Sequence, residues 1–193
     1  MLLLLIRHGH AVDDAPGLGD TGRWLTEKGR VATHRVARRV RKLKKLRPTA
    51  IWTSALVRSA QTAEIFAAGV KYEGEVQAVA ELSPGRDPGD LVALLNATPM
   101  PGPLALIGHE PSLSQILRVL AGDTGVDSLK KSGLVALEWE EGTGTVILAL
   151  NPSENREKKA KEKKIKKEKK EKKKEKKEEK DKDAKEPVTP EGK

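Results

Sequence analysis

Three short polar motifs, far apart in the sequence, combine histidine with arginine. They are Arg7-His8-Gly9, Thr53-Ser54 with Arg58 four positions further on, and Gly108-His109. Two histidines and two arginines with few acids nearby suit an anionic ligand. Arginine also presents a planar fork of N–H donors that matches phosphate oxygens well. The sequence therefore predicts a phosphate site built from Arg7, His8, Arg58 and His109.

His8 is the best-placed nucleophile in this set. The chain has no cysteine and no Gly-x-Ser-x-Gly motif of the kind that presents a nucleophilic serine. A neutral imidazole nitrogen can attack phosphorus and form a phosphohistidine, which divides one difficult displacement into two easier ones. Arg7, Arg58 and His109 would then bind the phosphoryl oxygens as negative charge spreads over them.

A metal site is the alternative chemistry for these histidines. His8, His10 and His109 could together supply imidazole ligands. Two neighbouring arginines would repel a divalent cation, and Glu110 is the only carboxylate beside these histidines in the sequence. We therefore expect no metal and no other cofactor. His10 becomes a further candidate for substrate binding, at the mouth of the pocket.

Buried strands and helices alternate along the chain. Apolar runs predict strands at 2–6, 50–53, 76–82 and 104–107, and a closing hairpin at 134–139 and 145–150. Amphipathic patterns predict helices from the N-cap Thr26 to Arg47 with Val36, Val40 and Leu43 on one face, at 57–68 ended by Gly69, at 90–96 and at 111–120. This order indicates a three-layer α/β/α sandwich with a mostly parallel sheet. Ligands bind such sheets at the carboxyl ends of the strands, where the polar motifs would meet.

Four ordered motifs resemble those of a known family. They are Arg7-His8-Gly9-His10, Asp20-x-x-Arg23-x-Leu25-Thr26-x-x-Gly29, Thr53-Ser54-x-x-x-Arg58-x-x-Gln61-Thr62-Ala63 and Gly108-His109-Glu110-Pro111. Together they are similar to the motifs of the histidine phosphatase superfamily, and specifically of its SixA-type phosphohistidine phosphatases. The resemblance covers residues 2 to about 150 and implies a phosphoglycerate mutase-like fold. It also implies that His8 is phosphorylated during turnover, that Arg7, Arg58 and His109 bind the phosphate, and that no metal is needed.

The acidic residues match the motifs of the family less closely. Many members use a Glu or Asp after the fourth strand as general acid, and Glu81 is the nearest candidate here, with Asp87 next. SixA-type members often lack a clear acid, because a phosphoramidate leaving group needs a weaker proton donor than an alkoxide does. Asp20 and Arg23 are expected to pair and tie down the first loop, which is a structural role.

The spacing of the motifs favours a protein substrate. Only 44 residues separate Gly9 from Ser54, and 54 separate Ser54 from His109, which leaves little chain for a lid over a small substrate. An open pocket favours a phosphohistidine on a phosphotransfer domain or phosphocarrier, and hence a role in signal transduction. A small-molecule phosphomonoesterase is the alternative within the superfamily. A non-catalytic basic adaptor that binds phosphate is the alternative from another class.

The net charge of +9 is concentrated after residue 153. Residues 154–193 contain 19 basic and 12 acidic residues, with Ile165 and Val188 as their only large apolar side chains. We expect a disordered or single-helix Lys/Glu-rich tail after one domain at 1–153. The interspersed acids argue against a nucleic-acid partner. The apolar opening is too short for a signal peptide or a membrane span, so we expect a cytoplasmic monomer.

Overall fold

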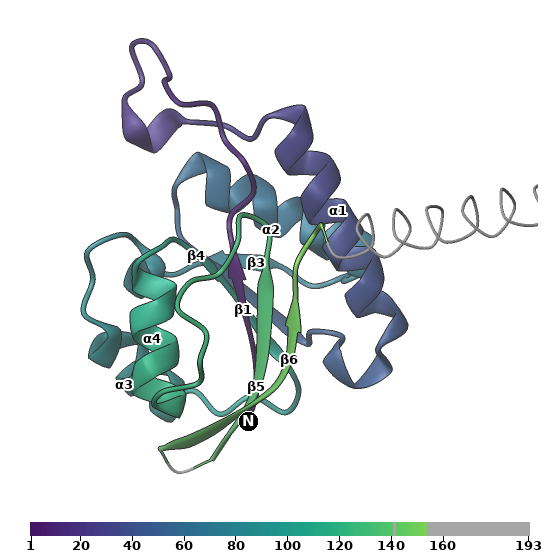
Figure 1. The fold of residues 1–193 in the computed structure, drawn as a ribbon, viewed down its shortest axis with the longest axis vertical. Coiled ribbons are helices and arrows are strands. Elements are labelled where there is room, and N and C mark those ends of the chain that lie inside the picture. Colours follow the sequence, from purple (N-terminus) through teal and green to yellow (C-terminus); the bar gives the residue numbers. More distant parts are fainter. Residues whose placement is uncertain (141, 154–193) are drawn as a thin grey trace, which may run out of the picture. The chain divides into compact units, whose positions relative to one another are not determined.

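A six-stranded sheet forms the centre of the fold, in a computed structural model that describes residues 1–140 and 142–153 (Figure 1). The strands lie in the spatial order β3-β2-β4-β1-β5-β6. They are β1 (Leu2–Arg7), β2 (Ala50–Thr53), β3 (Val76–Ala78), β4 (Leu104–Gly108), β5 (Leu134–Glu140) and β6 (Thr143–Leu150). The first four are parallel, whereas β1 pairs with β5, and β5 with β6, in antiparallel fashion. The predicted mostly parallel sheet is confirmed.

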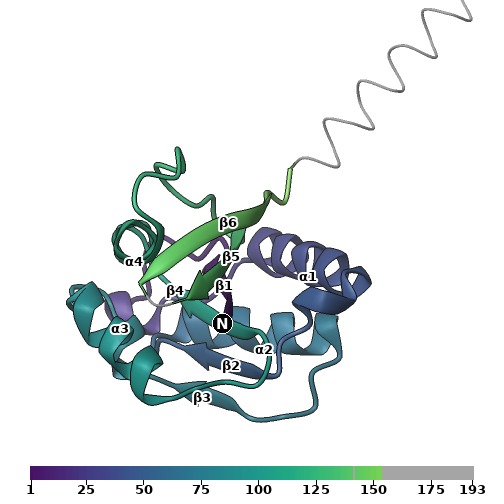
Figure 2. The ribbon, with the colours of Figure 1, turned by 90° about the horizontal axis from the view of Figure 1, so that it is seen from below.

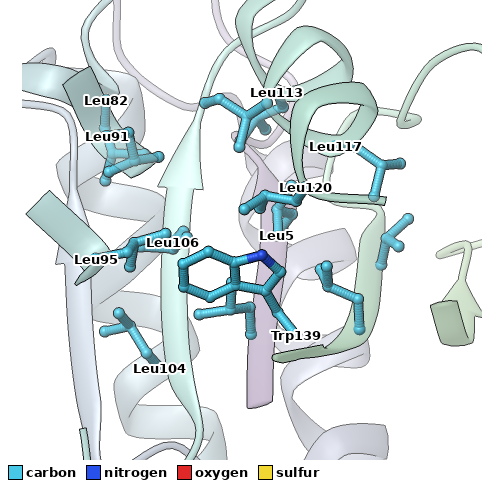
Figure 3. Packing of buried hydrophobic residues seen from close by; sticks show 14 of the residues in the cluster. Leu5, Leu82, Leu91, Leu95, Leu104, Leu106, Leu113, Leu117, Leu120 and Trp139 are labelled. Atoms are coloured by element: carbon cyan, nitrogen blue, oxygen red, sulfur yellow. The ribbon is translucent and has the colours of Figure 1, made fainter. Parts of the chain in front are cut away.

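Two pairs of helices cover the two faces of this sheet (Figure 2). Helices α1 (Glu27–Lys42) and α2 (Val57–Val70) lie on one face, and α3 (Pro88–Ala97) and α4 (Ser112–Ala121) on the other. Within β1, Leu4 and Ile6 join the core under α1 and α2. Leu3 and Leu5 join the core under α3 and α4, in which Figure 3 shows Leu5. Since successive strand residues point to opposite faces, one continuous apolar strand fills both layers. The predicted three-layer sandwich is confirmed.

Two further expectations concern the C-terminal tail and a membrane span. The predicted Lys/Glu-rich tail at 154–193 lies outside the described residues. Within the part of the chain that is described, no helix has the length and apolar character needed to cross a membrane.

Two predicted features of the first helices are wrong. Helix α2 continues through Gly69 and ends at Val70, and the next residue, Lys71, caps it with a left-handed φ of 62°. Gly69 instead allows close packing of helices, because a Cβ there would lie 2.5 Å from the Cβ of Ala37 on α1. The first helix was predicted to reach Arg47 with Leu43 on the same face as Val36 and Val40, but α1 ends at Lys42, and Leu43 is 41% exposed.

The segment between α2 and β4 contains less strand than predicted. Strand β3 ends at Ala78, and a 3₁₀ turn at Ala80–Leu82 replaces the expected continuation. The apolar Leu82 suggested a longer strand. It is buried as a strand residue would be, but it packs into the core under α3 and α4 from the 3₁₀ turn. Helix α3 begins two residues earlier than predicted, because Asp87 caps it and Pro88 occupies its first position.

The start of α1 lies directly against the loop that follows β1. Thr26 caps this helix as predicted, and its Oγ1 accepts the N–H of Gly29 at 3.2 Å. The carbonyl oxygen of His10 accepts the N–H of Thr26 at 2.9 Å. A Cβ at Gly29 would collide with the His10 carbonyl, so this approach of the loop requires glycine. The Leu-Thr-x-x-Gly part of the second motif thereby fixes the loop that carries His8.

We predict that Gly29→Ala destabilises the protein by about 1–3 kcal/mol, the usual cost of overpacking. The substitution would otherwise favour the helix, because alanine has the higher helix propensity by up to ~1 kcal/mol. Denaturant unfolding measures the effect. Lys28→Ala, at an exposed position of the same turn, should change the free energy of unfolding by less than about 0.5 kcal/mol. Equal effects of the two substitutions would contradict the close approach.

Candidate active site

The carboxyl ends of β1, β4 and β2 bring the three polar motifs together. Arg7 pairs with Gly108 in the parallel ladder between β1 and β4. The N–H of His8 donates to the carbonyl oxygen of Gly108 at 3.0 Å, and the N–H of Ser54 donates to that of Ile107 at 3.0 Å. Residues separated by about half the chain therefore meet at one edge of the sheet, as the strand order predicts.

The ring of His8 is buried and held in one orientation. The residue is 9% exposed, and its Nδ1 lies 2.8 Å from the carbonyl oxygen of Gly9. Since a carbonyl oxygen can only accept, Nδ1 carries the proton and Nε2 keeps its lone pair. The ring centroid lies 5.0 Å from that of His109. An unprotonated Nε2 is the atom that a nucleophilic histidine requires.

Burial keeps both histidines neutral near pH 7. The pKa of His8 is lowered to about 4, mainly because burial disfavours the charged ring, with a smaller contribution from the positive charges of Arg58 and Arg7. The pKa of His109 is lowered to about 3, again mainly by burial, with contributions from His8 and Arg58. Nucleophilicity at neutral pH therefore needs no separate base to deprotonate the ring.

Three buried nitrogen atoms at this edge have no hydrogen-bond partner among the described residues. They are Nε of Arg7 and both ring nitrogens of His109. A buried donor without a partner costs about 1–3 kcal/mol, so such atoms mark places where a ligand binds. Arg7 is oriented by its Nη1, which donates to the carbonyl oxygen of Leu129 at 2.8 Å. The oxygens of a phosphoryl group can accept from Arg7 and His109 together.

Arg58 is buried at the start of α2, and among the described residues its side chain is held by Asp20. Its Nη1 donates to the carbonyl oxygen of Asp20 at 2.7 Å, and its Nη2 donates to Oδ2 at 3.0 Å. Asp20 also pairs with Arg23 at 2.9 Å, which confirms the predicted ion pair. The link to Arg58 was not foreseen, because the two residues lie 38 positions apart.

Residues 12–24, here called the arm, form a loop that projects beyond the carboxyl end of β1 (Figure 1). Ala11 and Leu25 pair with each other at its base. The side-chain oxygen of Gln61 on α2 accepts the N–H of Leu25 at 2.8 Å. The base of the arm is therefore attached to α2, the helix that carries Arg58.

Two residues that support the loop carrying His8 were not predicted from the sequence. Oγ1 of Thr62 accepts the N–H of Gly9 at 3.0 Å. The N–H of Ser132, which has a left-handed φ of 59°, donates to the carbonyl oxygens of Arg7 and His8 at 3.2 and 3.1 Å. The Gln-Thr-Ala motif was an available signal for Thr62. No motif marked Ser132, because its contacts depend on a loop far along the chain.

The three weaker candidates differ in their placement. Nδ1 of His10 lies 3.0 Å from Oγ1 of Thr26, so its ring contacts the cap of α1. Asp87 caps α3 and accepts the N–H of Gly89 at 2.7 Å. Glu81 is half-buried in the 3₁₀ turn that packs against β4, and its role as a general acid stays a prediction. Within the described residues, no group of three or more histidine or acidic side chains is arranged to hold a metal ion.

We predict that the free energy of unfolding decreases as the pH falls from about 6.5 to about 4. The ordinary pKa of histidine is 6.5, and the native values for His8 and His109 are lower. The unfolded chain therefore binds protons in this window that the native protein excludes, and stability present above pH 6.5 is lost on acidification. The shift of His8 corresponds to about 3 kcal/mol.

Denaturant titrations across this pH range test the prediction. His109→Gln should flatten the decrease, whereas His34→Gln, at an exposed position of α1, should leave it unchanged. Parental stability that stays constant between pH 6.5 and 4 would contradict the burial of neutral histidines.

Sequence comparison gives two matches. The family model of the histidine phosphatase superfamily (branch 1) matches residues 3–86. An uncharacterized protein from Picosynechococcus sp. is 39% identical over 142 residues, which cover 71% of this chain and 84% of the relative.

Solved structures of the same fold include SixA proteins. The protein histidine phosphatase SixA complexed with tungstate is 26% identical, with a TM-score of 0.67 and coverage of 79% of this chain and 97% of that one. A putative phosphohistidine phosphatase SixA from Agrobacterium tumefaciens is 23% identical, with a TM-score of 0.69 and coverage of 78% and 97%. A mycobacterial glucosyl-3-phosphoglycerate phosphatase complexed with VO3 shares the fold alone, at 17% identity, a TM-score of 0.58 and coverage of 76% and 97%. With its motifs gathered at these strand ends and with these relatives, the chain belongs to the histidine phosphatase superfamily and is of the SixA type.

Proposed function

We propose that this protein is a phosphohistidine phosphatase that dephosphorylates a histidine of another protein through a phosphorylated His8. Membership of the histidine phosphatase superfamily supports phosphatase activity. The observation that carries the proposal is the unprotonated Nε2 of His8 beside the buried, unpartnered nitrogens of Arg7 and His109. The structure of SixA with tungstate, a tetrahedral oxyanion, supports a pocket of this kind.

In the first step, Nε2 of His8 attacks phosphorus. A new P–N bond forms while the P–N bond of the substrate breaks. The substrate imidazole leaves as a neutral ring when its other nitrogen carries a proton, so little help from an acid is needed. Arg7, Arg58 and His109 bind the phosphoryl oxygens. The ring of His8 becomes positively charged, and its Nδ1–H bond to the carbonyl of Gly9 stabilises that charge.

In the second step, water attacks the phosphorus of phosphorylated His8. A P–O bond forms, the P–N bond breaks, and both protons of the water stay with the inorganic phosphate that departs. His8 returns to its neutral form with the proton on Nδ1. Two guanidinium groups supply the positive charge that a metal ion supplies in other phosphoryl-transfer enzymes, so the cycle needs no metal.

The chain between β3 and β4 supports a protein substrate. Its longest element, α3, packs against α4 and buries Leu91 and Leu95 in the core. The segment is thereby used to complete the fold rather than to cover the pocket. A phosphoryl group carried on a protein surface needs a pocket that no such segment covers.

Exposed apolar side chains near the pocket also support a protein substrate. Leu18 and Trp24 on the arm are 61% and 41% exposed, and Val57, next to Arg58, is 37% exposed. Apolar groups around a polar pocket suit the surface of a partner protein, whereas a small phosphate ester offers them little to contact.

The second candidate function is that of a small-molecule phosphomonoesterase. The fold shared with a glucosyl-3-phosphoglycerate phosphatase supports it. An alkoxide is a poor leaving group unless an acid protonates it, and this function would therefore require Glu81 to act on the substrate. Hydrolysis rates for phosphohistidine protein, aryl phosphate and alkyl phosphate, measured with a chelator present, separate the two functions.

We predict that His8→Ala lowers hydrolysis of a phosphohistidine protein by at least about 10³-fold, because the nucleophile is lost. Phosphate release measures the rate. His34→Ala, exposed on α1, should keep the parental rate. Phosphohistidine survives alkali, so mass spectrometry after an alkaline quench should locate the phosphate of the intermediate on His8. Phosphate found on another residue would contradict the mechanism.

We predict that Leu18→Ser and Trp24→Ser each raise KM for the phosphohistidine protein by about fivefold, the loss typical of a contact residue. Kinetics on an aryl phosphate should stay unchanged, because we expect that substrate to be too small to contact the side chains of Leu18 and Trp24. Ile147→Ser is the matched control, since Ile147 is also exposed (43%) but lies on β6. Equal losses on both substrates would assign Leu18 and Trp24 to folding instead.

A further inference from the structure

Arg7, Arg58 and His109 are predicted to bind phosphate. Among the hydrogen bonds of the described residues, Asp20 is the only acidic residue bonded to one of these side chains. It accepts from both terminal nitrogens of Arg58, once through its main-chain oxygen and once through Oδ2. The Arg58 side chain is 6% exposed, whereas that of Asp20 is 60% exposed. The carboxylate therefore holds a buried guanidinium from its solvent side.

Asp20 is itself held in place by Arg23. Nη1 of Arg23 pairs with Oδ1 of Asp20 at 2.9 Å, which leaves Oδ2 for Arg58. Nε of Arg23 donates to the main-chain oxygen of Val12 at 2.7 Å. Val12 is in turn fixed by Trp24, whose carbonyl oxygen accepts the N–H of Val12 at 2.9 Å. An unbroken series of hydrogen bonds thus runs from the base of the arm to Arg58.

The two contacts leave part of Arg58 for a phosphoryl group. A guanidinium has five N–H groups, and Asp20 accepts one from Nη1 and one from Nη2. Three remain, including Nε–H, so the group can bind Asp20 and phosphoryl oxygens together. A planar group held at two atoms cannot rotate in its plane, and its remaining donors point in a fixed direction.

The negative charge of Asp20 also acts on the rest of the cluster. Hydrogen bonds from Arg23 and Arg58 lower the pKa of the Asp20 carboxyl, so it is ionised at neutral pH. Its charge favours protonation of His109. Asp20 therefore lies within electrostatic range of the pocket as well as in contact with Arg58.

We propose that Asp20 is a positioning residue, which fixes the guanidinium of Arg58 so that its free N–H groups point at the phosphoryl group bound beside His8. The proposal rests on the proposed function for its substrate, but its geometry concerns the binding of any tetrahedral oxyanion. The competing possibility is that Asp20 occupies Arg58 in place of the phosphoryl group. The two roles predict opposite signs for the change in oxyanion affinity.

Calorimetry with tungstate measures whether loss of Asp20 weakens or strengthens oxyanion binding, and it does so independently of turnover. Removal of a negative charge near an anion site should by itself strengthen anion binding. We expect Asp20→Ala to weaken tungstate binding about tenfold instead, because Arg58 loses its orientation. Asp20→Asn, which keeps one acceptor oxygen, should lie between Asp20→Ala and the parent. Tighter binding of tungstate to Asp20→Ala would overturn the proposal, as would unchanged binding.

A matched control and a double-mutant cycle complete the test. Asp13→Asn removes the same charge at an exposed position of the arm and should not weaken binding. In an Arg58→Ala background, Asp20→Ala should have no further effect if it acts through Arg58. An undiminished effect in that background would overturn the proposal. If the parent binds tungstate with this pattern but fails to hydrolyse phosphohistidine, the proposed function fails while the role of Asp20 stands.

Discussion

The parallel pairing of β1 with β4 is the constraint on which the site depends. It brings residue 8 beside residue 109 and sets their rings 5.0 Å apart. Both strands are apolar on both faces, so their side-chain pattern by itself does not select one register. The loops supply that selection. The N–H of Gly9 is bonded to Thr62, and the N–H of Ser132 is bonded to the end of β1, so a shift of β1 would break contacts outside the sheet.

The charges of the site follow from the burial of its two histidines. His8 and His109 are neutral because the enclosed edge of the sheet disfavours their charged forms. Arg7 and Arg58 supply two guanidinium groups, and Asp20 is the carboxylate that touches the second of them. Arg7 is oriented by the neutral carbonyl of Leu129. The result is a positively charged edge beside a neutral His8 ring, which suits the proposed attack of His8 on a phosphoryl dianion.

The sequence predicted those features that local patterns encode. The apolar run 2–6 leads directly into Arg7 and His8, so the end of a strand and the start of a polar motif could be located together. The incorrect predictions concern residues whose packing partners lie on distant elements. Gly69 has the signature of a helix end, but its lack of a side chain serves contact with Ala37, 32 positions earlier. The Asp20–Arg58 bond and the support from Ser132 were unforeseen for the same reason, because no local pattern reports a partner far along the chain.

The attachment of the arm to Arg58 has a consequence for how a large substrate could contribute to its own reaction. The arm exposes Leu18 and Trp24 and also bears Asp20, which bonds to Arg58. The side chains that a partner would contact and the residue that holds Arg58 therefore lie on the same short loop. Thermodynamic coupling of this kind is reciprocal: whatever restrains the arm favours phosphoryl binding, and a bound phosphoryl group restrains the arm. Under the proposed function, a partner protein that touches the arm would therefore apply binding energy gained far from phosphorus to the chemical step. A small phosphate ester that makes no contact with Leu18 would lack this source of rate enhancement.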